Sequence, residues 1–79
     1  MRTIVVGAGK VGFSIAATFS AKGYDVTLIE KNKFRLMNVA EYLDVRTIQG
    51  YGNQISDLLN AGANTADLII AATECDEVN

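Results

Sequence analysis

The sequence has no histidine and a single cysteine, Cys75, among its 79 residues. One cysteine cannot form a disulfide within the chain, and without histidine the usual ligand sets for zinc and other transition metals are missing. We therefore predict that the chain holds no metal ion. A reducing compartment is the simplest environment for it.

Long apolar runs and clustered charges are also missing. No apolar stretch approaches the roughly 18 residues that a membrane-spanning helix needs, so any role at a membrane is expected to be that of a peripheral subunit. The formal charge is −2, with seven basic and nine acidic residues and no block of one sign. Because nucleic-acid binding needs basic residues clustered on one face, we predict no nucleic-acid partner.

Apolar runs of strand length alternate with amphipathic segments along the whole chain. We predict strands at 3–6, 25–29, 45–48 and 67–72, and helices at 10–22, 32–42 and about 55–62. Gly23 is expected to end the first helix in a left-handed conformation, and Asn32 is expected to cap the second. The spacing of Val11, Ile15 and Phe19 predicts that they form the side of the first helix that faces the sheet.

This order, βαβαβαβ, predicts an α/β fold, a Rossmann-like doubly wound parallel sheet with strand order 3-2-1-4. A ligand is then expected above the carboxyl ends of strands one and four. The last strand would leave an apolar edge, and residues 73–79 look like the first turn of another helix. We interpret residues 1–79 as the front part of a larger nucleotide-binding domain, and expect a second copy of the chain to cover this edge.

The segment Gly7-Ala8-Gly9-Lys10-Val11-Gly12 follows a predicted strand and opens a predicted helix. This is the context that the dinucleotide-binding pattern GxGxxG requires. Gly7 permits a tight turn, Gly9 permits close approach of a pyrophosphate, and Gly12 permits close packing of the helix. The amides at the start of the helix would attract the phosphates.

Glu30 ends the second predicted strand and is the acidic residue that this pattern expects. It would accept hydrogen bonds from both hydroxyls of an adenosine ribose and repel a 2′-phosphate, which favours NAD over NADP. Cations at Lys31, Lys33 and Arg35 could soften that preference, although a solvated helix start explains them more simply. The alternative for Glu30 is an exposed carboxylate without a ligand.

Other candidates follow the remaining strands, each beside a simpler alternative. Lys10 contacts a phosphate or points into solvent, Tyr51 lies beside adenine or in an ordinary turn, and Thr73 contacts the ligand or caps a helix. No residues combine into an acid-base pair, so no catalytic residue is predicted. The complete set of predicted binding residues is Gly7, Ala8, Gly9, Lys10, Val11, Gly12, Glu30, Lys31, Tyr51, Gly52, Ala72, Thr73 and Glu74.

Taken together, the segments VVGAGKVG, VTLIEKN, VRTIQGYGN and LLNAGANTADLIIAATECDEVN closely resemble one family. They are similar to the N-terminal nucleotide-binding domain of TrkA-type potassium-uptake regulators, also called the RCK or KTN domain. The resemblance covers the whole chain. Its last segment is the most specific, because dehydrogenases share the glycine turn but not that ending.

The resemblance implies a cytoplasmic subunit, peripheral to the inner face of the plasma membrane, that binds NAD or NADH, or in relatives ATP or ADP. Such a subunit gates a membrane potassium transporter or channel and assembles as dimers that build rings. It implies binding roles for Gly7 to Val11, Glu30, Tyr51-Gly52 and Thr73-Glu74, without catalysis. Two alternatives stay open: the cofactor-binding half of an NAD-dependent dehydrogenase, and a structural oligomerisation module with a vestigial site.

Overall fold

The computed structural model describes residues 1–51 and 55–72. Strands and helices alternate through these residues, with one short 3-10 helix before the last strand. In chain order the elements are β1 (Arg2–Val6), α1 (Lys10–Ala21), β2 (Asp25–Glu30), α2 (Lys33–Tyr42), β3 (Arg46–Gln49), α3 (Ile55–Asn60), η1 (Ala63–Thr65) and β4 (Leu68–Ala71).

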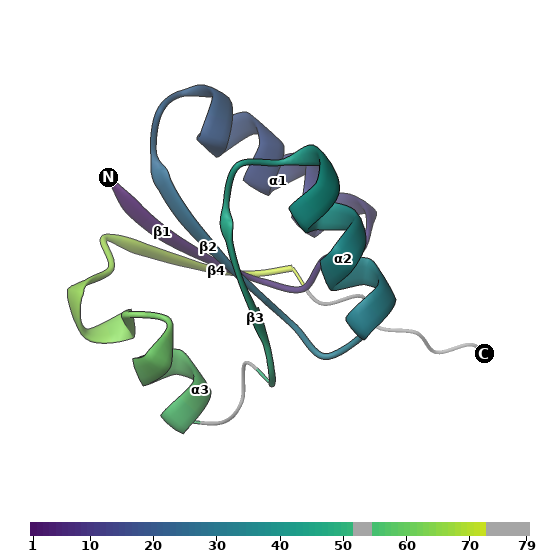
Figure 1. The fold of residues 1–79 in the computed structure, drawn as a ribbon. Coiled ribbons are helices and arrows are strands. Elements are labelled where there is room, and N and C mark those ends of the chain that lie inside the picture. Colours follow the sequence, from purple (N-terminus) through teal and green to yellow (C-terminus); the bar gives the residue numbers. More distant parts are fainter. Residues whose placement is uncertain (52–54, 73–79) are drawn as a thin grey trace.

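The four strands form one parallel sheet in the order β3-β2-β1-β4. Figure 1 shows α1 and α2 on one face of this sheet and α3 on the other. The Rossmann-like α/β fold predicted from the sequence is therefore confirmed, including its strand order. Because all strands run the same way, the loops that follow β1, β2 and β3 meet at one end of the sheet, where the strands finish.

The two central strands supply most of the core. Val5 and Leu28 are fully buried on the side of α1 and α2, and Ile29 is fully buried on the side of α3. Helices cover both faces of β1 and β2, which explains why these strands read as continuous apolar runs.

The side of α1 that faces the sheet differs from the prediction. Gly12 and Ala16 are buried there, and Ile15 and Phe19 are only partly buried at its margins. Val11 is 56% exposed, so its assignment to the sheet side was wrong. Neighbouring helical residues point about 100° apart, so a helix that turns Gly12 toward the sheet turns Val11 away from it.

The end of α1 follows the prediction at Gly23, whose φ is +84°. The amide of Gly23 donates to the carbonyl of Ser20 at 2.9 Å, and the amide of Tyr24 donates to the carbonyl of Phe19 at 3.1 Å. This pair of bonds is the Schellman motif. The rings of Phe19 and Tyr24 then meet edge to face, with centroids 5.5 Å apart, which fixes the corner between α1 and β2.

The start of α2 also follows the prediction. The Oδ1 atom of Asn32 accepts hydrogen bonds from the amides of Phe34 at 2.9 Å and Arg35 at 3.2 Å. These bonds satisfy two donors that have no partner within the helix. The 3-10 helix at Ala63–Thr65 was not predicted; it begins after Gly62, whose φ is +90°.

Among the described residues, β4 pairs only with β1 and lies at the edge of the sheet. Its side chains are far less covered than those of β1: Leu68 is 38% exposed and Ile69 is 47% exposed. The apolar edge expected from the sequence is present, and its cover by a second copy stays a prediction. Within the described ranges, no helix has the length and apolar character needed to cross a bilayer.

Candidate functional site

The glycine turn begins directly after β1. Gly7 has a φ of +109°, a conformation that favours glycine, and its amide donates to the carbonyl of Ile29 in β2 at 2.8 Å. A Cβ atom on Gly12 would lie only 1.9 Å from the carbonyl oxygen of Gly7. The turn and the first turn of α1 are therefore in direct contact, which only a glycine at position 12 permits.

The residue at the N-cap position of helix α1 has no side chain with which to cap it. Gly9 is the N-cap residue, and its carbonyl accepts the first helical hydrogen bond, from the amide of Phe13 at 2.9 Å. The first amides of any α-helix have no carbonyl in a preceding turn to bind, and the first turn of α1 contains no acidic residue. The start of α1 can therefore receive the oxygens of an anion, with the helix dipole adding to the attraction.

Glu30 lies beside this turn, and it is 5% exposed. Its Oε1 atom accepts a hydrogen bond from the amide of Ala8 at 2.6 Å, and its Oε2 atom accepts one from the amide of Asn32 at 2.8 Å. The alternative for Glu30, an exposed carboxylate at the end of the strand, is therefore wrong. Its contact with the glycine turn was not predicted, because nothing in the residue spacing distinguishes a ribose ligand from a ligand of the turn.

The loop after β3 is joined to the same place. The amide of Gly50 donates to the main-chain carbonyl of Glu30 at 3.1 Å, and Nε2 of Gln49 donates to the carbonyl of Lys31 at 3.3 Å. The side chain of Tyr51, the next residue, is more than half exposed. The structure thus brings Lys31 and the beginning of the predicted adenine loop to the end of β2 where Glu30 lies.

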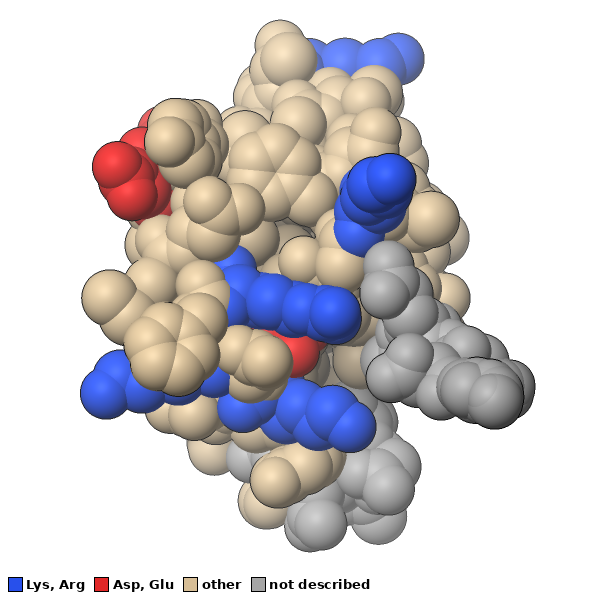
Figure 2. Space-filling model, turned by 90° about the vertical axis from the view of Figure 1, so that its right-hand side faces the viewer, with Lys and Arg blue, Asp and Glu red and all other residues tan. Residues whose placement is uncertain are grey.

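Basic side chains surround this end of the sheet. Figure 2 looks at the side toward which β1 runs in Figure 1, and it shows lysine and arginine side chains around a small area of acidic atoms. Lys31 and Lys33 are exposed at the start of α2. An open hollow of about 800 Å³ runs between α1 and α2 from the glycine turn, and its lining residues are Ala8, Gly9, Lys10, Phe13, Ser14, Ala17, Arg35 and Asn38.

The structure brings most of the predicted binding residues to one end of the sheet: Gly7, Ala8, Gly9, Lys10, Val11, Gly12, Glu30, Lys31 and Tyr51. The side chain of Ala72 is buried against α1, so only its main chain is left to contact a ligand. Gly52, Thr73 and Glu74 lie outside the described residues. The ligand role of each candidate stays a prediction.

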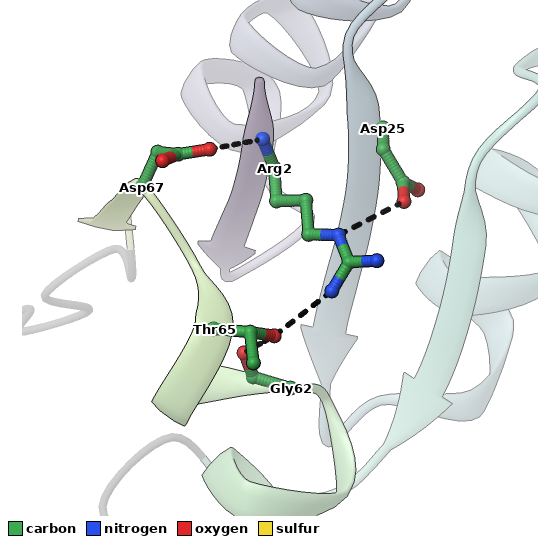
Figure 3. Close-up of polar contacts among 5 residues, drawn as sticks. All are labelled: Arg2, Asp25, Gly62, Thr65 and Asp67. Atoms are coloured by element: carbon green, nitrogen blue, oxygen red, sulfur yellow. Dashed lines mark hydrogen bonds and ion pairs between the residues drawn. The ribbon is translucent and has the colours of Figure 1, made fainter.

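The opposite end of the sheet has polar contacts that the sequence did not indicate. Figure 3 shows Arg2 at their centre: its Nη1 atom donates to Oγ1 of Thr65 at 3.0 Å, and its Nε atom lies 4.0 Å from a carboxylate oxygen of Asp25. The amide of Arg2 donates to Oδ2 of Asp67 at 2.8 Å. These contacts connect β1 to β2 and to the segment that leads into β4, far along the sheet from the glycine turn.

Comparison with known proteins places this geometry in a family. The family model described as the TrkA-N domain matches residues 3–79. Over all 79 residues the chain is 38% identical to "Trk system potassium uptake protein TrkA" of Azorhizobium caulinodans. It is 39% and 42% identical to proteins named "Trk system potassium uptake protein TrkA homolog" in Methanothermobacter thermautotrophicus and Archaeoglobus fulgidus.

These alignments include the whole chain but only part of each relative. The chain spans 17% of the Azorhizobium protein, 37% of the Methanothermobacter protein and 18% of the Archaeoglobus protein. The matched part contains the glycine turn, Glu30 and all four strands. The chain belongs to the TrkA-N domain family.

Proposed function

We propose that this chain is a regulatory nucleotide-binding domain of a potassium-uptake system. It binds NAD or NADH, or ATP or ADP, and its bound state controls a potassium transporter or channel in the membrane. One observation carries the proposal: the start of α1, where the N-cap residue is a glycine, lies beside the buried carboxylate of Glu30 in a chain of the TrkA-N family.

The phosphates are proposed to bind at the start of α1, on the amides of residues 9–11. The first amides of a helix point toward an anion bound at its start, and the helix dipole adds to the attraction. The nearby basic side chains of Lys10 and Arg35, which line the hollow beside the turn, add favourable charge. This arrangement supports a role in which the protein binds a diphosphate or triphosphate and does not react with it.

The adenosine ribose is proposed to bind at Glu30. Each carboxylate oxygen has two lone pairs, and each accepts one amide hydrogen bond in the structure, so capacity for both ribose hydroxyls is left. The loop that begins at Tyr51 and Gly52 would lie beside adenine, and Thr73 and Glu74, which follow β4, would approach the ligand from the side of that strand. A 2′-phosphate would be repelled by Glu30, so NADP is expected to bind weakly.

Control of a transporter needs no catalytic group. Nucleotides that differ in their contacts at the carboxyl ends of β1 and β4 favour different arrangements of the domain. The difference in affinity between these arrangements is what shifts their populations. The protein is proposed to act as a homo-oligomer, a dimer or a ring, in the cytoplasm at the inner face of the membrane.

Calorimetric titration of the intact protein with NAD, NADH, ATP, ADP and NADP tests this proposal. We expect the four nucleotides without a 2′-phosphate to bind with different affinities and NADP to bind least. Absence of binding by all five would refute the nucleotide role and favour a structural module. Oxidation of bound NADH by a substrate would instead indicate a dehydrogenase.

The phosphate position has its own test, the variant Gly9→Val. A valine side chain at the start of α1 would block close approach of the phosphates, so nucleotide binding should be lost. Ala21→Val, at the exposed far end of the same helix, is the matched control and should bind normally. Unchanged affinity in Gly9→Val would mean that the phosphates bind elsewhere.

A further inference from the structure

The side chain of Glu30 is bound by the protein itself. Both of its oxygens accept amide hydrogen bonds, one from the glycine turn and one from the residue before α2. Its main-chain carbonyl accepts a third, from Gly50 after β3. One buried residue therefore contacts all three loops that follow β1, β2 and β3.

From these contacts we propose that Glu30 is a positioning residue for the glycine turn, in addition to any contact with ribose. It holds the turn in the shape that receives the phosphates, so the affinity for the phosphate part of a nucleotide depends on this carboxylate. The inference rests on the proposed nucleotide binding, and it deepens that function by assigning a second role at the same site.

The first half of the turn is attached to the end of β2 by two successive amides. Gly7 donates to the carbonyl of Ile29 at 2.8 Å, and Ala8 donates to the carboxylate of Glu30 at 2.6 Å. Ala8 is buried, so without the carboxylate its amide would lose its acceptor in a place that water reaches poorly. The turn would then relax, and the start of α1 would relax with it because Gly12 contacts Gly7.

Glu30 is itself held in place, which a positioning residue requires. The amide of Asn32 binds its second oxygen at 2.8 Å, so the side chain is held from two sides. A hydrogen bond between an amide and a charged carboxylate is about twice as strong as one between neutral groups. The negative charge of Glu30 lies close to the proposed phosphate position and repels the phosphates. That repulsion is offset if Glu30 holds the glycine turn in the shape that binds them.

The test compares ADP with 2′,3′-dideoxy-ADP, which lacks the hydroxyls that Glu30 would bind. Calorimetry is done on the intact protein, on Glu30→Ala and on Glu30→Gln, with Glu41→Gln on the exposed side of α2 as the control. We expect Glu30→Ala to weaken binding of dideoxy-ADP by about tenfold or more. Glu30→Gln keeps one acceptor oxygen and should retain part of the affinity, and the control should bind both nucleotides normally.

If Glu30 acted only through the ribose, its replacement would weaken ADP alone and leave dideoxy-ADP unchanged, which would overturn the inference while the proposed function stands. Failure of the unchanged protein to bind either of these nucleotides, and also NAD, NADH and ATP, would instead refute the proposed function.

A second measurement needs neither a ligand nor a folded alanine variant. Hydrogen exchange at the Ala8 amide should be slow in the ligand-free protein and faster by about tenfold or more in Glu30→Gln or Glu30→Ala. Fast exchange at Ala8 in the unchanged protein, or equal exchange in every variant that folds, would contradict the positioning role.

Discussion

The two ends of the sheet each have one charged residue that joins neighbouring segments, but in different surroundings. At the carboxyl end, Glu30 is 5% exposed and accepts two amide hydrogen bonds of 2.6 Å and 2.8 Å. At the amino end, the exposed side chain of Arg2 reaches Thr65 at 3.0 Å and Asp25 at 4.0 Å (Figure 3). A single charged side chain therefore joins neighbouring segments at each end, but the contacts are buried at the carboxyl end and exposed to solvent at the amino end.

This difference in burial decides how much each set of contacts contributes. An exposed ion pair is screened by water and salt, and it restricts two long side chains, so its net contribution is small. A buried amide that loses its acceptor has no water to replace it, so the cost of breaking the contact is larger. We expect the carboxyl end to be stiff and sensitive to substitution, and the amino end to tolerate it.

The largest expected effect is that of Gly12→Ala, which would break the carboxyl end outright. The added Cβ would lie 1.9 Å from the Gly7 oxygen, so the turn and α1 must separate, at a cost of about 3 kcal/mol or more in the free energy of unfolding. Denaturant titration measures this loss. Gly23→Ala is the control: its Cβ meets nothing within 4 Å, and the positive φ alone should cost about 1 kcal/mol. Equal losses in the two variants would contradict the contact.

Glu30→Ala should have the next largest effect on stability. It removes the acceptor of two amides, one of them buried, and should lower the free energy of unfolding by about 1–3 kcal/mol. Glu41→Ala, on the exposed surface of α2, should change it by less than about 0.5 kcal/mol. A Glu30 variant as stable as the Glu41 variant would remove the contrast between the two ends.

Asn32→Ala separates the cap of α2 from the Glu30 contact, because the amide of Asn32 is kept while its side chain is lost. The variant should lower the free energy of unfolding by about 1 kcal/mol, since two amides lose their acceptor. Asn38→Ala in the same helix should cause no loss, because alanine favours helix. A loss of similar size in both variants would show that the cap contributes nothing.

Arg2→Ala is expected to have the smallest effect, about 0.5 kcal/mol and at most about 1 kcal/mol, because only the exposed side-chain contacts disappear. The effect should shrink further in 1 M salt, where the screening length falls to about 3 Å and exposed charges farther apart than this interact weakly. Denaturant titration at low and high salt measures both. A loss larger than that of Glu30→Ala would reverse the comparison between the two ends.

The sequence predicted the features that depend on local chemistry. Alternating apolar runs and helical segments predicted the parallel sheet and its order. Gly23 and Asn32 predicted the end of α1 and the start of α2, because a left-handed residue and a side-chain cap act within a few residues.

The features that the sequence did not predict depend on contacts between distant residues. Val11 fits the apolar spacing of a helix, but the approach of Gly12 to Gly7 sets how α1 is rotated on the sheet. The contacts of Arg2 with Thr65 and Asp67 join residues more than 60 positions apart, and no periodic pattern records them. The attachment of Glu30 to Ala8 likewise depends on how two strand ends meet.

The contact between Gly7 and Gly12 also has a mechanical consequence. Because the turn and α1 touch without a side chain between them, we expect a tilt of the turn to tilt the helix with it. Its 12 residues extend about 18 Å at 1.5 Å per residue, so a tilt of about 3° displaces the far end by about 1 Å. The far end of α1 is the corner where Phe19 meets Tyr24, so a small tilt at the turn is expected to produce a larger displacement at that corner.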